Sequence, residues 1–97
     1  VEAEVTWIDG YGNVELAAGE PHAEAAGIDE FATVEASAGT FSARRVSAYA
    51  ELGSDELGLL VDSSRFLAIV RNQGSAAQTL HIEPGQVVVL RSARGSE

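Results

Sequence analysis

The chain has 97 residues, the length of one domain, and its fifteen acidic and six basic residues give a net charge of −9. Such a surface repels phosphate groups, which argues against nucleic acid and against anionic membranes as partners. The sequence contains no cysteine, which excludes a disulfide framework and a thiolate metal site. Its two histidines, His22 and His81, lack the spacing of a metal-binding pair.

No apolar run approaches the ~20 residues that a membrane-spanning helix needs. The first residues, VEAEVTW, already alternate as a strand does and lack the basic and apolar regions of a secretory signal. We therefore expect a cytoplasmic location. The chain is expected to be either a small protein without a leader or a part cut from a longer one.

The first half of the chain predicts four strands and one short helix. Residues 3–8 alternate and are rich in β-branched and aromatic side chains, and 13–16 resume the pattern after a glycine-containing corner. A proline near its start and a glycine near its end predict one or two helical turns in 19–28. Alternation then predicts a strand at 31–37 and, after a turn, a long strand at 41–52.

The second half predicts three more strands. Residues 57–63 and 65–72 are expected to pair across a tight Ser-Ser corner, and 74–80 form a helical turn that begins with a serine cap. A final strand covers 86–91, and 92–97 are expected to fray. Six or seven short strands with turn signals between them predict an all-β fold, a small antiparallel β-barrel-like domain that spans the whole chain.

Three short stretches carry more polar and aromatic side chains than plain turns require. They are the corner Asp9–Asn13, the corner Asp62–Arg65 and the segment Arg71–Gln73. An exposed ring such as Tyr11 offers a face on which a nucleobase can stack. The amide of Asn13 both donates and accepts hydrogen bonds, which suits the edge of an adenine. Backbone N–H groups before a helical turn can bind a base edge or an anion.

Each stretch also has a purely structural interpretation. Asp, Gly and Asn at the first corner are ordinary turn residues, and Tyr11 between them could instead pack into the barrel. The serines at the second corner can serve only to make a turn, and Ser75 can serve only as a helix cap. No Ser-His-Asp set and no pair of acids suited to catalysis occurs, and the two histidines are expected to be structural or solvated. The sequence therefore predicts binding residues, with no catalytic and no metal-ligating residue.

Taken together, the three stretches resemble a known family. WIDGYGNVEL (7–16) resembles the "IDRFGNxxxN" corner of the S-adenosyl-L-methionine hydrolases (adenosine-forming), relatives of the adenosyl fluoride and chloride synthases. YAELGSDELGLLVDSS (49–64) and LAIVRNQGSAAQTLHIEPGQVVVL (67–90) resemble the rest of the C-terminal domain of that family. The resemblance runs from about residue 4 to residue 91 and rests on three motifs in the same order.

The resemblance implies a two-domain enzyme of which this chain is one domain. In the family, an α/β N-terminal domain carries the Asp-Arg-His group that activates water, and a β-barrel-like C-terminal domain closes the site. Subunits form trimers, and each site lies between the N-terminal domain of one subunit and the C-terminal domain of its neighbour. Water attacks C5′ of S-adenosyl-L-methionine, which releases adenosine and methionine. The substrate is the small molecule bound, no separate cofactor is needed, and this chain alone is expected to be inactive.

The resemblance also implies roles for individual residues. By motif position, Asp9 would hold the methionine ammonium group, Tyr11 would stack on adenine, and Asn13 would bond to the adenine edge. Tyr49 falls at the position of the second stacking aromatic residue. Ser63 would meet the methionine carboxylate.

The remaining roles lie in the second and third stretches. Arg71, Asn72 and the backbone at Gln73 would border the adenine. Ser64 stands where the halide-using relatives have an arginine for the carboxylate, and Arg65 stands where a glycine is common. Arg65 could take over the carboxylate, or it could only fill surface.

Other departures lie in the first corner. Gly10 replaces the usual arginine, Tyr11 the usual phenylalanine, and Ala17 the asparagine that commonly follows the motif. In this interpretation the ring of Tyr11 is a stacking platform, and its two flanking glycines let a flat base approach the backbone.

Two other functions remain open at the level of the sequence. The first is a stand-alone β-barrel that binds nucleosides or supports oligomerisation without catalysis. The second is a structural β domain whose corners are only turns. A catalytic domain encoded upstream would favour the hydrolase, and an adenosine titration followed through Trp7 fluorescence would separate binding from its absence.

Overall fold

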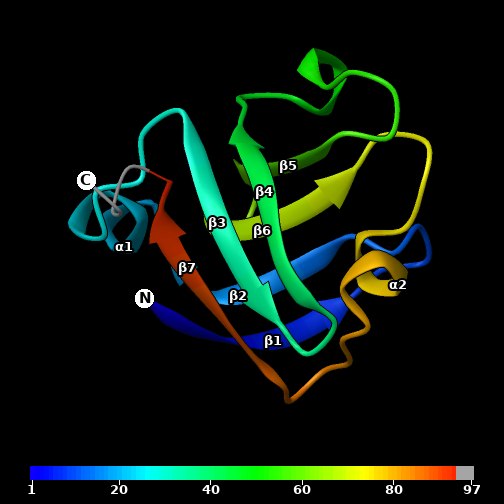
Figure 1. The fold of residues 1–97 in the computed structure, drawn as a ribbon, viewed down its shortest axis with the longest axis horizontal. Helices are drawn as coiled ribbons and strands as arrows, with labels where there is room; N and C mark the ends of the chain where they lie inside the picture. The colour runs from blue at the N-terminus through cyan, green and yellow to red at the C-terminus, as the bar shows by residue number, and fades with distance from the viewer. Residues whose placement is uncertain (94–97) are drawn as a thin grey trace.

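The structure is a computed structural model that describes residues 1–93. In that range seven strands close into one barrel with the order β1-β2-β6-β5-β4-β3-β7 (Figure 1). The predicted all-β barrel is therefore confirmed. The strands are β1 (Glu2–Ile8), β2 (Val14–Gly19), β3 (Phe31–Ala36), β4 (Gly39–Arg45), β5 (Leu57–Val61), β6 (Phe66–Arg71) and β7 (Val87–Ser92).

Six of the seven strand pairings within residues 1–93 are antiparallel, as predicted, and one is parallel. The exception joins β4 to β5, with Arg44 opposite Gly58 and Arg45 opposite Leu59. A parallel pair needs a connection that carries the chain back to the start of the next strand. Here residues 46–56 make that connection.

The predicted strand 41–52 is therefore too long at its C-terminal end. β4 ends at Arg45, and Tyr49–Glu51 form a single turn of 3₁₀ helix, η1. The apolar residues Val46 and Leu52 are buried, which explains the continued alternation, but they pack in a small cluster outside the barrel with Ala68 and Val70 of β6. The alternation in this segment therefore reflects contact with the outer face of the sheet.

The core fills the inside of the barrel with inward-facing aliphatic side chains. Val5, Leu16, Val34, Leu59 and Ile69 come from five different strands and are fully buried. Each buried side chain of this size stabilises the fold by roughly 1.5–3 kcal/mol relative to its exposed state. Among the described residues no polar or charged side chain is buried, so the polar groups of the chain lie on its surface and loops.

Two short helices lie beside the barrel, α1 (Glu20–Ala25) and α2 (Ala76–Leu80), on opposite sides in Figure 1. Both were predicted. α1 starts with Pro21 in its first turn, and Gly27, at φ 73°, lies just beyond its end. α2 is capped by Ser75, whose Oγ accepts a hydrogen bond from the Gln78 N–H at 3.1 Å. In the described part of the chain neither helix is long or apolar enough to cross a membrane.

At the C-terminal end, β7 continues to Ser92, one residue beyond the predicted strand. The expectation of a frayed tail falls mainly on 94–97, which lie outside the described residues.

Candidate functional site

The corner between β1 and β2 is organised by the carboxylate of Asp9. Its Oδ1 accepts hydrogen bonds from the backbone N–H groups of Tyr11 and Asn13, both at 2.9 Å. Its Oδ2 accepts one from the Asn13 side-chain amide, also at 2.9 Å. Partial burial raises the pKa of Asp9, but the hydrogen bonds from Asn13, Tyr11 and Gly12 outweigh it and lower the pKa below its usual value. Asp9 therefore stays ionised and holds the corner rigid.

This corner turns the ring of Tyr11 away from the protein, and the ring is 84% exposed. The alternative that Tyr11 packs into the barrel is therefore wrong. One side-chain N–H of Asn13 donates its hydrogen bond to Asp9. Within residues 1–93 the side-chain oxygen and the second N–H of Asn13 have no partner. One donor and one acceptor are thus left for a ligand.

Gly12 has a structural role that the sequence did not indicate. Gly12 has φ 86°, and a Cβ at this position would lie 2.0 Å from the Oγ of Ser75. The carbonyl of Gly12 also accepts a hydrogen bond from the Ala77 N–H at 3.0 Å. Gly12 is required because the cap of α2 packs directly on it. A Cβ at Gly10 would meet nothing within 4 Å.

A hollow of about 620 Å³ opens beside this corner, and we call it the tyrosine hollow. It is lined by Tyr11, Asn13, Tyr49, Arg71, Gln73, Gly74 and Ser75. Two aromatic rings, an amide and a guanidinium therefore surround one space, although the residues come from separate stretches of the sequence. The ring of Tyr49 is 44% exposed. Aromatic faces and an amide are the groups that bind a planar base.

Tyr49 is held in place by its hydroxyl group. The hydroxyl donates a hydrogen bond to the Arg71 carbonyl at 3.1 Å and accepts one from the Gln73 N–H at 3.0 Å. The backbone N–H of Gln73, a candidate ligand for a base edge, is therefore already paired. Its side-chain oxygen accepts a hydrogen bond from Ser54 at 2.8 Å.

Arg71 and Asn72 hold the same loops together. The guanidinium of Arg71 donates to Thr79 Oγ1 at 2.9 Å and forms an ion pair of 3.3 Å with Asp55. The amide of Asn72 donates to the carbonyls of residues 52 and 53, at 3.0 Å each. Arg71 lines the tyrosine hollow with its side chain fixed, whereas Asn72 lines neither hollow of the candidate site.

A second hollow of about 290 Å³ adjoins the first, and we call it the acidic hollow. Asn13 and Tyr49 line both hollows. The other residues that line the acidic hollow are Trp7, Asp9, Glu15, Leu60, Asp62, Ser63, Ser64, Ala68 and Val70. Three carboxylates and two serines thus lie beside the space that the two tyrosines border.

The serines reach the acidic hollow from the corner between β5 and β6. Asp62 Oδ1 accepts hydrogen bonds from the N–H groups of Ser64 and Phe66, at 2.8 and 3.0 Å. Arg65 follows Ser64 with φ 71° and is exposed. It lines neither hollow, so in the described chain no basic side chain faces the acidic hollow.

Eight of the ten predicted site residues therefore border two adjoining hollows, and Arg65 and Asn72 do not. Sequence reasoning missed Trp7 and Glu15, and it placed Asp62 in the second polar stretch without a binding role; all three line the acidic hollow. A signal existed for Asp62, because it leads the second polar corner. None existed for Trp7, since alternation along β1 would turn its side chain into the core.

Glu15 and Asp62 bring two acids together. The pKa of Glu15 is raised, first by a hydrogen bond shared with the carboxyl of Asp62, then by burial and by the charge of Asp62, against a smaller lowering by Thr6. The Thr6 hydroxyl donates to Glu15 Oε1 at 3.3 Å. No group of three or more His, Asp or Glu side chains in residues 1–93 is arranged to hold a metal ion.

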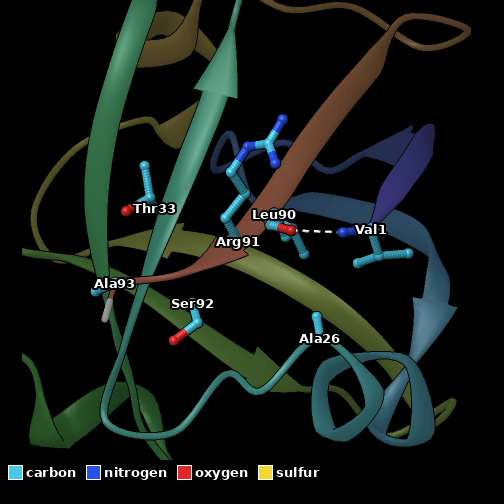
Figure 2. A pocket seen from close by; sticks show the side chains of 7 residues that line it. All are labelled: Val1, Ala26, Thr33, Leu90, Arg91, Ser92 and Ala93. Atoms are coloured by element: carbon cyan, nitrogen blue, oxygen red, sulfur yellow. Dashed lines mark hydrogen bonds between the residues drawn. The ribbon is translucent and has the colours of Figure 1, made fainter. Parts of the chain in front are cut away.

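A third hollow, of about 640 Å³, lies between the N-terminus, the end of β7 and the residues after α1 (Figure 2). There the N-terminal amino group of Val1 donates to the Leu90 carbonyl at 2.6 Å. None of the predicted site residues lines it. His22 accepts a hydrogen bond from the Gly19 N–H at 3.0 Å as part of the cap of α1, and His81 ends α2, so neither histidine lies at the two hollows.

The described residues thus form a closed β-barrel with an aromatic hollow and an acidic hollow on its outside. The chain belongs to the family described as "SAM hydroxide adenosyltransferase C-terminal domain", which it matches over residues 3–89. This confirms the family resemblance. A search of curated proteins finds no match.

Two solved structures share the fold. One, titled an uncharacterized conserved protein from Thermotoga maritima, superposes with a TM-score of 0.86 at 26% identity and is matched over 92% of this chain. The other, a conserved hypothetical protein from Thermus thermophilus, gives a TM-score of 0.64 at 21% identity over the same share. The chain spans 35% and 34% of the length of these two proteins.

Proposed function

We propose that this chain binds S-adenosyl-L-methionine as the substrate-binding domain of an enzyme that cleaves it with water to adenosine and methionine. The observation that carries the proposal is the pair of adjoining hollows. The tyrosine hollow would take the adenine between Tyr11 and Tyr49, with Asn13 at the base edge. The acidic hollow would take the methionine part, whose ammonium group and sulfonium sulfur are both cationic.

The charges of the two hollows support this orientation. Oδ2 of Asp9 accepts only the Asn13 amide, which leaves one of its lone pairs for an ammonium group. The aromatic faces of the tyrosine hollow suit the uncharged base. Ser63 and Ser64 are the groups that could donate hydrogen bonds to the methionine carboxylate, and Arg65 would need to move to reach it.

The chemistry of cleavage is assigned to a second domain. A water nucleophile must be activated and placed in line with the C5′–S bond, and a general base in hydrogen-bond reach is needed for that step. In residues 1–93 neither histidine lies at the hollows. We therefore propose that an N-terminal domain of a neighbouring subunit, in a homotrimer, supplies the catalytic groups.

The test is a titration of the 97-residue chain followed by NMR chemical shifts, which detect weak binding. Adenosine should shift the signals of the tyrosine hollow, and S-adenosyl-L-methionine should shift those of both hollows. Asn13→Ala should weaken adenosine binding by about 1–3 kcal/mol, as expected for the loss of a buried polar partner. Adenosine binding with no response of the acidic hollow to S-adenosyl-L-methionine would favour a nucleoside-binding module, and no binding would favour a structural domain.

A further inference from the structure

An irregularity in β1 turns Trp7 out of the core. Val5 faces inward and is fully buried, so regular alternation would bury Trp7 as well. Instead, the pairing with β2 shifts: Val5 lies opposite Leu16 and Trp7 opposite Glu15, so two steps along β1 match one step along β2. Such a bulge adds one residue to one strand and re-aims the side chains that follow.

The bulge leaves the ring of Trp7 59% exposed. Burying a Trp side chain removes a large apolar area from water and so stabilises a fold. Because Trp7 is exposed, the barrel lacks this contribution. Bulges are frequent beside functional sites, where they aim a side chain at a ligand. The outward ring of Trp7 is therefore available to contact a ligand.

The ring of Trp7 lies opposite one charged neighbour in the sheet, Glu15. Trp7 lies opposite Glu15, Glu15 opposite Ala68, and Ala68 opposite Leu60, so four adjacent strands place these residues in one row. All four line the acidic hollow. Ala68 and Leu60 form a low apolar floor, with the ring at one end of the row and Glu15 beside it.

The charge of this hollow is uncompensated in the described chain. Its titratable residues are Asp9, Glu15, Tyr49 and Asp62, and no basic side chain lines it. Asp9 and Asp62 each accept hydrogen bonds from N–H groups of their own corner, whereas Glu15 lines the hollow beside Asp62, whose carboxyl raises the pKa of Glu15. A carboxyl group beside Glu15 disfavours the ionised form of Glu15, and a cation placed between the acids and the ring removes that cost.

We infer that the acidic hollow recognises the sulfonium cation of the substrate, with Trp7 as the aromatic face and with Glu15 and Asp62 as the opposing negative charges. The inference rests on the proposed function. A sulfonium has no N–H or O–H to donate, so it is recognised by an aromatic face and by nearby charge. When the C5′–S bond breaks, its electron pair stays on sulfur, the sulfur becomes a neutral thioether, and this attraction ends.

The experiment compares two ligands that differ in the charge on sulfur. S-adenosyl-L-methionine carries a sulfonium, and S-adenosyl-L-homocysteine is the neutral thioether with the same adenosine and amino-acid groups. Dissociation constants of both, and of adenosine, are measured by NMR titration of the 97-residue chain at neutral pH. The chain should prefer the sulfonium by at least the two- to fivefold that an exposed cation–π contact provides, about 0.5–1 kcal/mol.

Variants then separate the ring from the charge. Trp7→Leu should reduce the preference by about two- to fivefold, and Trp7→Phe should keep part of it. Glu15→Gln should also reduce it. Phe66→Leu removes an exposed ring outside both hollows, and Glu4→Gln removes an exposed acid elsewhere on β1, so both should keep the full preference. Adenosine affinity should be the same in all five proteins.

Equal affinity of the unaltered chain for the two ligands would overturn the inference, and so would a full preference in either Glu15→Gln or Trp7→Leu. In both cases retained adenosine binding would leave the proposed function standing. Failure of the unaltered chain to bind any of the three ligands would overturn both. Because Glu15→Gln leaves the bulge and the ring in place, it tests the inference even where Trp7→Leu does not fold.

Discussion

The two corners led by aspartate have the same backbone geometry and present different side chains. In each, Oδ1 of the aspartate accepts hydrogen bonds from the N–H groups two and four residues later. In each, the aspartate carbonyl accepts one from the N–H three residues later, at 3.0 Å in the first corner and 2.9 Å in the second. The acceptor residues are Asp9 and Asp62.

The corners differ at the residue with positive φ and in what they carry. The first uses Gly12, pressed against Ser75, and presents the ring of Tyr11. The second uses Arg65, and presents the serines before it. The comparison shows that the turn and binding interpretations are compatible. The aspartate builds the turn, and the residues between it and the next strand are free to contact a ligand.

The largest expected effect comes from filling the space at the first corner. Gly12→Ala should destabilise the fold by about 2–4 kcal/mol, because the new Cβ overlaps Ser75 and the backbone has positive φ. Gly10→Ala is the matched control and should change stability little, since its Cβ has free space. Denaturant unfolding measures both. Equal midpoints for the two variants would show that α2 does not need to pack on this corner.

Tyr11→Ala separates turn from ligand contact. Because the ring is 84% exposed, its loss should change the free energy of unfolding by less than about 0.5 kcal/mol. Adenosine affinity should fall by roughly 1–3 kcal/mol if the ring stacks on the base, and Tyr11→Phe should retain most of it. A thermal melt and a ligand titration on the same samples give both quantities. Unchanged adenosine affinity in Tyr11→Ala would remove the ring from the site.

Arg65→Gly makes the second corner resemble the first. A non-glycine residue at positive φ costs about 1–2 kcal/mol, and glycine removes that cost while adding freedom to the unfolded chain. We expect a net gain of about 0.5–1 kcal/mol in stability. Arg65→Ala keeps the positive-φ cost and should show no such gain. If Arg65 binds the methionine carboxylate, both variants should also lose affinity for S-adenosyl-L-methionine relative to adenosine.

The smallest effect concerns the charge of the first corner. The pKa of Asp9 is lower in the folded chain than its ordinary value of 3.8, so ionisation of Asp9 stabilises the fold at higher pH. This contribution is present above pH 3.8 and is lost as the pH falls through the lower folded pKa. Asp9→Asn should therefore be less stable than the unaltered chain near neutral pH, and the gap should narrow as the solution becomes strongly acidic. Melting temperatures across a pH series from acidic to neutral measure it.

The strands of the barrel could be predicted because each buries alternate side chains. Alternation predicts β3 and the part of β4 from Phe41 onward, where Phe31 lies opposite Arg44. Residues 38–40 are expected to form a turn, but Gly39 and Thr40 already pair with β3. The end of β4 could not be predicted, because Val46 and Leu52 are buried against the outside of the sheet. No sequence pattern within β4 or β5 predicts their parallel pairing, because it depends on the path of the connecting residues 46–56 between the two strands.

The candidate site could be predicted where its residues lie at turns. Asp9, Tyr11 and Ser63 are polar or aromatic residues at corners, so they stand out against the strand pattern. Asn72 is also a polar residue at a corner, so the sequence suggested the same role for it. Its side-chain amide instead donates hydrogen bonds to two backbone carbonyls, and only the tertiary structure brings these groups together. Trp7 was missed because the bulge, which changes its face, depends on the pairing with β2 and not on the residues of β1 alone.

The seam between β1 and β7 has a consequence for folding kinetics. Val1 and Leu90 hydrogen-bond across it, 89 positions apart in sequence, so the barrel closes only after its last strand is in place. Contacts between distant parts of a chain fold slowly, because the entropy of closing a long loop is lost before the contact is gained. Until closure, β1 presents an unpaired edge that can pair with another chain. We therefore expect refolding yield to fall as protein concentration rises, with loss by aggregation competing against closure of this seam.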